Sequence, residues 1–424
     1  LSVHEPTVAA LWREDDLPGG DLQYALRACW IAASYRLHQL HITQDGRYLV
    51  DPGTHYTFKR SPSGSHMQIV DAVAPGSEVL DLGCSQGLLA QHAGRDRVSP
   101  GETVWIDVDT LMTHDVCGPP TIEIFQREFG RAAKVWDKEG RAIIPDHYIF
   151  TADQHAHRNI QILRAFAAEQ DLPHYYDVGG DRYKGVCHMA LAEEGFNRPG
   201  TTLFGTDSHT CTSGAFGLFS TGIGNTDAGF VMGTGKLLIK VPETMHFCLE
   251  GELQPGVMAK DIILHAIGEI GFDGATYRAM QFDGPGASGL SMDDRMTVAN
   301  MAIEAGGKNG IFEYDDKTGA MVDERTKLNG TKSDYEPVER DENETFVYDT
   351  TINLSQLEPT VACHPDPGQR KLAREMTDMK LDRAYIGSCT GGKTSDFLAF
   401  AEVVSPHQLA SEAWSWKAAV AGPS

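Results

Sequence analysis

The sequence has no C-x-x-C pair, although it contains eight cysteines. They are scattered at positions 29, 84, 117, 187, 211, 248, 363 and 389. A small secreted protein that relies on disulfides places its cysteines densely and in pairs. We therefore expect a reducing, cytoplasmic environment in which most of these thiols fill the core.

Long apolar runs and an excess of basic residues are also absent. No apolar stretch approaches the ~20 residues that a membrane-spanning helix needs, so we expect no membrane partner. Lys and Arg number 36 against 59 Asp and Glu, which gives a net charge of −23. This charge argues against general nucleic-acid binding. It leaves room for a small anionic substrate that is held by a few local groups.

With 424 residues, the chain is long enough for about two to four domains. Its stretch "SEVLDLGCSQGLLAQ" predicts a buried strand, a glycine turn and a helix. This stretch resembles the first motif of S-adenosylmethionine-dependent methyltransferases, which implies cofactor contacts by Asp81, Gly83 and Gly87. An ordinary strand–turn–helix is the competing interpretation. From about residue 90 onward the sequence is consistent with one α/β enzyme.

Several later segments have clear patterns. Residues 221–242 predict a small-residue helix followed by a strand, and residues 259–271, 291–307 and 395–404 predict helices. Residues 382–387 predict a strand. The polar stretch 315–344 is typical of a solvated surface loop or linker.

The stretch "GSCTGGKT", residues 387–394, matches the phosphate-binding loop pattern G-x-x-x-x-G-K-[ST]. Such a loop lies early in its domain, because the strand that carries the magnesium-binding acid follows it. Few residues follow Lys393, and none of them forms a clear apolar strand that ends in aspartate. We therefore interpret this segment as a glycine-rich loop that holds a lone cysteine, Cys389.

Three histidines lie near glycine or proline at predicted strand ends, and two of them have an aspartate close by. They occur in Asp146-His147, at His188 and in Asp207-Ser208-His209. A neighbouring carboxylate fixes the tautomer of an imidazole and raises its pKa, which suits it to proton transfer. Together these residues predict a site that moves protons on a polar substrate.

Three separated stretches, "TLFGTDSHTCTSGAFG", "LSMDDRMTVANMAIEAGGKNG" and "YIGSCTGGKTSDF", together resemble the aconitase superfamily. The likeness covers about residues 88–404. It is strongest to the large-subunit branch of 3-isopropylmalate dehydratases, with homoaconitases near it. It implies a multi-domain α/β fold of three-layer αβα architecture around a [4Fe–4S] cluster. It also implies a separate small subunit as partner.

The resemblance also implies roles for individual residues. Those implied to be catalytic are Asp146, His147, His188, Asp207, His209 and Glu304. His147 matches the acid that protonates the leaving hydroxyl, while Ser208 and Asn300 match polar positions that line the substrate site. Cys389 matches the first of three cluster-binding cysteines. For Asn300 and Glu304, two exposed polar positions on an amphipathic helix are the alternative interpretation.

The sequence departs from the family in two places. No cysteine follows Cys389, so only one of the three expected cluster ligands is present, and we expect a truncated, inactive chain. The stretch "HDVCGPPTIEIF" also lacks the glutamine with which aconitases contact their substrate. We divide the chain into a methyltransferase-like stretch (1–87), aconitase-like domains (88–242 and 243–348), an incomplete third domain (349–404) and an unmatched tail (405–424).

The resulting functional hypothesis is a hydro-lyase that interconverts 2-isopropylmalate and 3-isopropylmalate in leucine biosynthesis. Its substrate would be a small hydroxy-di- or tricarboxylate. The alternatives are a homoaconitase-type dehydratase, or a methyltransferase with an appended non-catalytic region.

Overall fold

The computed structural model describes residues 83–330, 334–340, 344–380 and 384–404. All of them belong to one compact unit, Val73–Ser424. The predicted contact residue Asp81 and the predicted tail at 405–424 lie outside the described residues. None of the helices in the described ranges combines the length and the apolar character that a membrane span requires.

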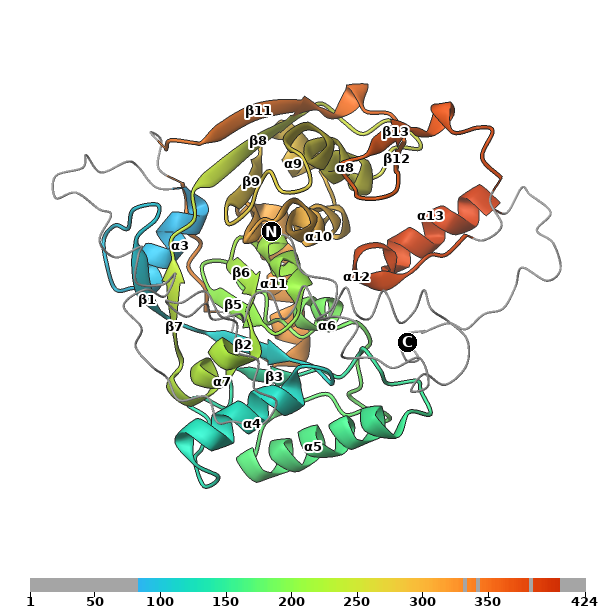
Figure 1. The fold of residues 1–424 in the computed structure, drawn as a ribbon. Coiled ribbons are helices and arrows are strands. Elements are labelled where there is room, and N and C mark those ends of the chain that lie inside the picture. The colour runs from blue at the N-terminus through green and yellow to red at the C-terminus, as the bar shows by residue number, and fades with distance from the viewer. Residues whose placement is uncertain (1–82, 331–333, 341–343, 381–383, 405–424) are drawn as a thin grey trace, which may run out of the picture. The chain divides into compact units, whose positions relative to one another are not determined.

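The larger sheet has five parallel strands in the order β4-β3-β2-β5-β6. They are β2 (Thr110–Thr113), β3 (Arg141–Ile143), β4 (His174–Tyr175), β5 (Thr202–Gly205) and β6 (Phe219–Gly222). Residues of α4 (Gly118–Phe129), α5 (Gln154–Gln170) and α7 (Asn225–Thr234) share a core with one face of this sheet (Figure 1). The opposite face packs on α6 (Cys187–Glu193) and on the 3₁₀ segment η2 (Ser208–Phe216). Burial on both faces is typical of a parallel sheet.

A second sheet has four parallel strands in the order β10-β9-β8-β11. They are β8 (Thr244–Glu250), β9 (Ala279–Asp283), β10 (Asn309–Phe312) and β11 (Tyr348–Asn353). Its helices are α8 (Ala259–Ile270), α9 (Pro285–Gly289) and α10 (Met292–Asn300), followed by η3 (Met301–Ala305). Met112 of the first sheet and Phe282 of the second lie in one continuous core.

Two antiparallel strand pairs complete the sheets: β1 (Thr103–Asp107) pairs with β7 (Lys236–Lys240), and β12 (Thr360–Ala362) with β13 (Arg370–Leu372). The remaining elements are α3 (Cys84–His92), α11 (Asp316–Asn329), η4 (Leu354–Gln356), η5 (Ala373–Glu375), α12 (Ser388–Gly391) and α13 (Thr394–Val404). The α/β class with parallel sheets is confirmed. The domain boundaries stay a prediction.

Two local predictions are wrong. The stretch predicted as a loop contains helix α11, where the Asp315 side chain accepts a hydrogen bond from Thr318 N and Gly330 ends the helix with a φ of 64°. These are ordinary start and stop signals that outweigh the polar composition. Residues 384–387, predicted as part of a strand, have no regular structure. The helix and the following strand predicted within 221–242 are present, as are the helices predicted at 259–271, 291–307 and 395–404.

The glycines of the methyltransferase-like motif pack closely against other parts of the chain. A Cβ atom at Gly83 would lie 1.7 Å from Oε1 of Glu344, and one at Gly87 would lie 2.8 Å from Cγ1 of Val338. Gln86 of the same helix donates hydrogen bonds to Pro242 O and to Thr244 Oγ1. These contacts favour close packing of α3, not an open approach to a cofactor, as the reason for glycine here.

The packing around Glu344 disfavours the ionised form of its carboxyl. Burial raises the pKa of its carboxyl to about 7, and the charge of Glu313 adds to the effect against the opposing influence of Gln281 and Arg340. Its Oε2 accepts a long hydrogen bond of 3.4 Å from Gln281, while Oε1 has no partner among the described residues. The folded protein therefore binds this proton more tightly than the unfolded chain does.

We predict that Glu344→Gln stabilises the protein above pH 7. Because the folded pKa lies above the unfolded one, the free energy of unfolding falls as pH rises from 4.5 to 7. A neutral amide avoids this cost, which we place at about 1 kcal/mol after allowing for solvent screening. Urea unfolding at pH 4 and pH 8 measures the difference. An equal effect at both values would contradict the titration argument.

Candidate active site

Three neighbouring strands of the five-stranded sheet end in acidic and imidazole side chains. His114 and Asp115 follow β2, Asp146-His147 follows β3, and Asp207-Ser208-His209 follows β5. Because β2 lies between β3 and β5 and all three run in the same direction, their carboxyl ends meet at one edge. The topology therefore gathers these side chains at one site, and the predicted placement of His147 and His209 at strand ends is confirmed.

His188 lies elsewhere than the sequence predicted. It is the second residue of helix α6 and not the end of a strand, because Val186 begins a helical turn there. Its side chain is 2% exposed. The helix nevertheless points the imidazole to the same edge, where Nε2 lies 2.8 Å from Asp207 Oδ1.

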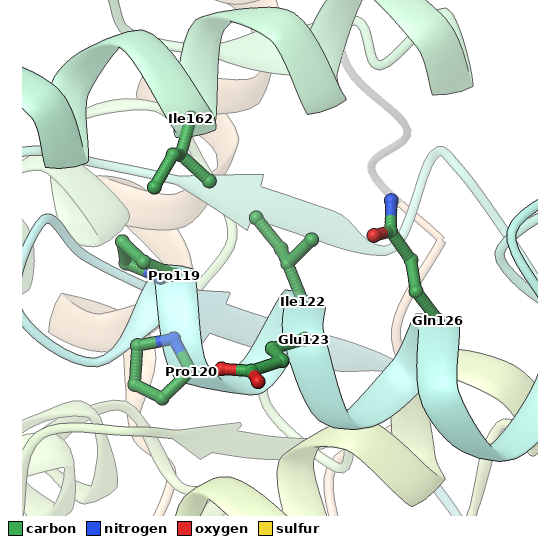
Figure 2. A pocket seen from close by; sticks show the side chains of 6 residues that line it. All are labelled: Pro119, Pro120, Ile122, Glu123, Gln126 and Ile162. Carbon is green, nitrogen blue, oxygen red and sulfur yellow. The ribbon is translucent and has the colours of Figure 1, made fainter.

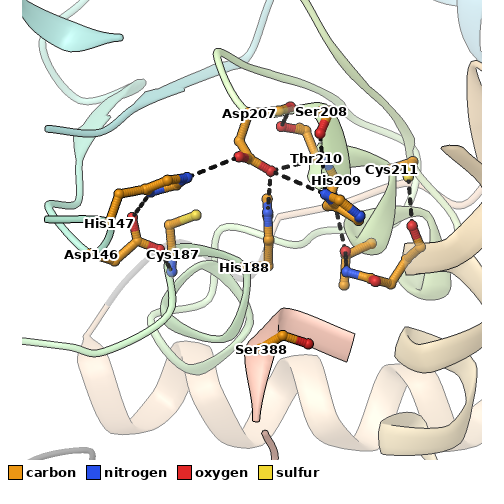
Figure 3. A network of polar contacts seen from close by, with 12 residues as sticks. Asp146, His147, Cys187, His188, Asp207, Ser208, His209, Thr210, Cys211 and Ser388 are labelled. Atoms are coloured by element: carbon orange, nitrogen blue, oxygen red, sulfur yellow. Dashed lines mark hydrogen bonds and ion pairs between the residues drawn. The ribbon is translucent and has the colours of Figure 1, made fainter. Parts of the chain in front are cut away.

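His147 lies between two carboxylates. Its Nδ1 is 2.6 Å from Asp146 Oδ1, and its Nε2 is 3.3 Å from Asp207 Oδ2 (Figure 3). An imidazole that donates from both nitrogens is the charged form. Burial disfavours that charge, but the two carboxylates outweigh burial and raise the pKa of His147 to about 10. The site thus holds a protonated imidazole. The His147 side chain is 36% exposed.

Asp207 is the centre of the network. Its Oδ1 accepts from His188 Nε2 and from the backbone N of His209, both at 2.8 Å, and its Oδ2 faces His147 (Figure 3). Burial would raise the pKa of this carboxyl, but the hydrogen bonds from His147 and His188 hold it far below its usual range. One carboxylate therefore fixes the orientation of two imidazoles and the start of η2.

A third pair joins the two sheets. His209 Nε2 lies 3.0 Å from Glu304 Oε1, and its Nδ1 lies 3.1 Å from Ser208 Oγ. Burial lowers the pKa of His209, but the hydrogen bond and charge of Glu304 outweigh it, so the pKa is raised overall. Glu304 Oε2 is buried without a partner among the described residues. That oxygen is free to accept from a ligand.

Cys389 lies beside the same network. Burial raises the pKa of its thiol, the side chain of Asn300 lowers it, and the charges of Asp207 and Glu304 raise it further. Asn300 is fully buried, so the interpretation of this residue as surface is wrong. Its Nδ2 donates to Thr212 Oγ1 at 2.8 Å, and its Oδ1 accepts from Thr390 Oγ1 at 2.5 Å. The structure thus brings together every predicted site residue from Asp146 to Cys389.

One supporting acid, Asp115, is not indicated by the sequence patterns described above. Asp115 accepts three backbone hydrogen bonds, from Asp146 N and His147 N at Oδ1 and from Tyr148 N at Oδ2, at 2.7–2.9 Å. These bonds fix the loop that carries His147. The His-Asp doublet after β2 resembles the other doublets and could have signalled this role.

His114, the neighbour of Asp115, is not indicated by those patterns either. Its ring stacks on that of His147 at a centroid distance of 3.9 Å. Burial and the charge of His147 lower the pKa of His114, so it stays neutral beside a charged ring. Atoms of His114, Asp115, Asp146 and His147 lie close enough to surround a metal ion. However, the oxygens of Asp115 are already occupied by backbone donors.

Another concave region has fewer side chains that could transfer protons or bind a metal. A depression between α4 and α5 contains one carboxylate and no histidine or cysteine (Figure 2). Its lining residues are Pro119, Pro120, Ile122, Glu123, Gln126 and Ile162. In contrast, the histidine network has buried polar atoms without partners among the described residues, including His114 Nε2, His188 Nδ1 and Tyr183 OH. Unsatisfied buried polar atoms at one place are typical of a ligand site.

Comparison with known proteins identifies the family. Residues 86–375 match the model of the aconitase family (aconitate hydratase). The chloroplastic 3-isopropylmalate dehydratase large subunit of Arabidopsis thaliana is 51% identical over 352 residues, or 79% of this chain and 68% of that protein. The large subunit of Acetivibrio thermocellus is 43% identical over 330 residues, which cover 78% of this chain and 76% of that protein.

Among solved structures, aconitase X of Thermococcus kodakaraensis matches with a TM-score of 0.31 and 10% identity, over 64% of this chain and 63% of that one. That likeness is too weak to inform the fold. The match to the family model, on the other hand, extends over the β-strands, the histidines of the site and Glu304. The chain therefore belongs to the aconitase family of hydro-lyases, as a homologue of the large subunit of 3-isopropylmalate dehydratase.

Proposed function

We propose that this chain provides the proton-transfer part of a dehydratase site that interconverts 2-isopropylmalate and 3-isopropylmalate. The observation that carries the proposal is the continuous network of three imidazole–carboxylate pairs, Asp146–His147, Asp207–His188 and Glu304–His209. Loss of water from a hydroxy acid needs a proton donor at the leaving oxygen. His147, charged and partly exposed, suits that role.

The other residues orient this donor and bind the substrate. Asp146 holds Nδ1 of His147 at 2.6 Å, whereas the contact of Nε2 with Asp207 is longer, at 3.3 Å. The Nε2 proton is therefore the one that would pass to the leaving hydroxyl, which would replace Asp207 as its hydrogen-bond partner. The Ser208 hydroxyl, which lies 3.1 Å from Nδ1 of His209, would donate to a carboxylate of the substrate, and the unpartnered Oε2 of Glu304 would accept from its hydroxyl. Positive imidazoles also attract a dianionic substrate to a chain of net negative charge.

A [4Fe–4S] cluster is typical of the aconitase family, and it supplies a Lewis acid that polarises the C–O bond. Cys389 is the residue of this chain that would bind it. The other described thiols near the network include Cys117, Cys187 and Cys211, and burial raises the pKa of all three thiols. Buried thiols of this kind are poor ligands. The described residues therefore do not fit the complete cluster, and no step here depends on it.

The relatives are named as large subunits, which supports a small subunit as the partner of this chain. We propose that the partner supplies the base that removes the α-proton, since the neutral imidazole stacked on His147, that of His114, is only 2% exposed. The Arabidopsis relative is chloroplastic, so the expectation of a cytoplasmic location stays a prediction. The preference for isopropylmalate over a homoaconitase substrate is likewise part of the proposal.

Ligand titration tests the proposed function on the chain as it exists. We expect 2-isopropylmalate at millimolar concentration to shift the imidazole NMR signals of His147 and His209. The ring of His147 stacks on His114 and that of His209 pairs with Glu304, and both partners carry an unpartnered polar atom. The signal of His92 serves as the control, since that ring is engaged by Asp109 and the Leu88 carbonyl away from the network.

Homocitrate in the same titration decides between the two dehydratase substrates, and the tighter ligand identifies the branch. S-adenosylmethionine should produce no shift and no heat. Binding of that cofactor, or a lack of response of His147 and His209 to every hydroxy acid, would overturn the proposal.

A further inference from the structure

Lys393, the lysine of the phosphate-loop pattern, is buried inside the protein. Its side chain is 2% exposed, and its Nζ makes three contacts. It donates to Thr297 Oγ1 at 2.7 Å and to the Thr390 carbonyl at 2.6 Å, and it pairs with Asp396 Oδ2 at 2.8 Å. An ammonium has three donors, so all of them are used within the protein. Nothing remains for a phosphate group.

These contacts attach the Cys389 loop to helix α10. Thr297 belongs to α10, whereas Thr390 is the residue directly after Cys389. The same helix ends at Asn300, which accepts from Thr390 Oγ1. One turn of α10 thus holds the loop at two points, the Lys393 ammonium and the Thr390 hydroxyl.

The loop has a backbone that needs such support. Ser388 has a φ of 71°, which is costly for a residue other than glycine. Its Oγ accepts from Thr390 N at 3.2 Å. A conformation of this kind persists only where the surroundings hold it in place. The contacts of Lys393 and Thr390 are the described interactions that do so next to Cys389.

We propose that Lys393 is a positioning residue for the Cys389 thiol: its buried ammonium ties the 387–393 loop to Thr297 of α10. The tie sets where the sulfur lies relative to Asn300, Asp207 and Glu304. The inference rests on the proposed role of Cys389 as a metal-binding thiol for its biological meaning, but the geometry does not depend on that role. It also explains why a phosphate-loop pattern occurs without a nucleotide site.

Alkylation of individual thiols tests this proposal. We expect iodoacetamide to modify Cys389 on the order of tenfold faster in Lys393→Met than in the wild type, because loss of a buried donor set opens the loop locally. Mass mapping of peptides gives the rate for each cysteine. Cys211, which is 1% exposed, reports whether the whole fold has loosened.

Thr297 provides a second route in case Lys393→Met fails to fold. Thr297→Val removes the acceptor without leaving a cavity and should also speed the reaction of Cys389, whereas Thr297→Ser keeps the oxygen and should not. Lys317→Met is the matched control, since Lys317 also donates to carbonyls, those of Ser288 and Leu290, but lies on α11. The rate at which Cys389 is alkylated in Lys317→Met should stay within about twofold of the wild-type rate.

Two results would overturn the proposal. One is an unchanged rate at Cys389 in both Lys393→Met and Thr297→Val. The other is equal acceleration at Cys389 and Cys211, which would mean that Lys393 only stabilises the fold. Because the assay contains neither iron nor a hydroxy acid, its outcome is separate from that of the isopropylmalate titration.

Discussion

Asp207→Asn should lower the free energy of unfolding by about 3 kcal/mol, since it leaves buried partners without their charge. It should also lower the pKa of His147 from about 10 toward its ordinary value, because Asp207 is one of the two carboxylates that hold the charged ring. An amide of the same size keeps the shape of the site but cannot accept from both His147 and His188. Urea unfolding and an NMR titration of the His147 signals measure the two effects.

Asp109→Asn is the matched control for this change. Asp109 also binds a histidine, with Oδ2 at 2.8 Å from His92 Nε2, and it accepts from the backbone N of Thr202. We expect a loss of stability of similar size and no change in the pKa of His147. If both variants lowered the pKa of His147 equally, Asp207 would have no special place in the network.

His147→Asn should reduce turnover on the order of 10²- to 10⁴-fold, the usual contribution of a general acid. Asparagine keeps a hydrogen bond to Asp146 but has no proton to give to the leaving hydroxyl. The measurement uses the corresponding change in the Arabidopsis large subunit with its small subunit, with isopropylmalate as substrate. His92→Asn, which alters an imidazole–carboxylate pair outside the network, should leave turnover per folded molecule unchanged. Retained activity in His147→Asn would remove the assigned role.

The same variant has a pH signature in this chain. The folded pKa of His147, about 10, lies above the ordinary imidazole value of 6.5. Its contribution to stability is therefore complete below pH 6.5 and is lost as pH rises through 10. In His147→Asn this part of the pH dependence should disappear, so the unfolding free energy should fall less steeply between pH 7 and pH 9.5. An unchanged slope would contradict the raised pKa.

Much of the site could be predicted because several of its aspartate and histidine residues are neighbours in the sequence. Asp146-His147 and Asp207-Ser208-His209 lie next to one another in the chain, and both follow strands whose apolar pattern is clear. The resemblance to the aconitase family added Asn300 and Glu304 and gave Cys389 its implied role, and no local pattern connects these three residues. The structure brings these residues together at one edge of the five-stranded sheet and beside η3 and α12.

The errors have a common physical origin. Helix α11 was interpreted as a loop because its polar composition concealed a capping aspartate and a terminal glycine. The short apolar run near His188 fits a strand or a buried helix equally well, which is why the pattern predicts a strand end there. The doublet His114-Asp115 was not assigned a role, since three backbone donors from another loop define it.

The sequence by itself determined the α/β class, the absence of a long apolar run, the residue types at the strand ends and the single cysteine in a glycine loop. Only the tertiary structure decided that Asp207 serves two imidazoles at once and that Asp115 anchors the loop of His147. It also decided that Lys393 points inward to α10. The reason is that composition and periodicity report on a residue's own segment, whereas the partner of a buried charge is chosen by which segments the sheets bring together.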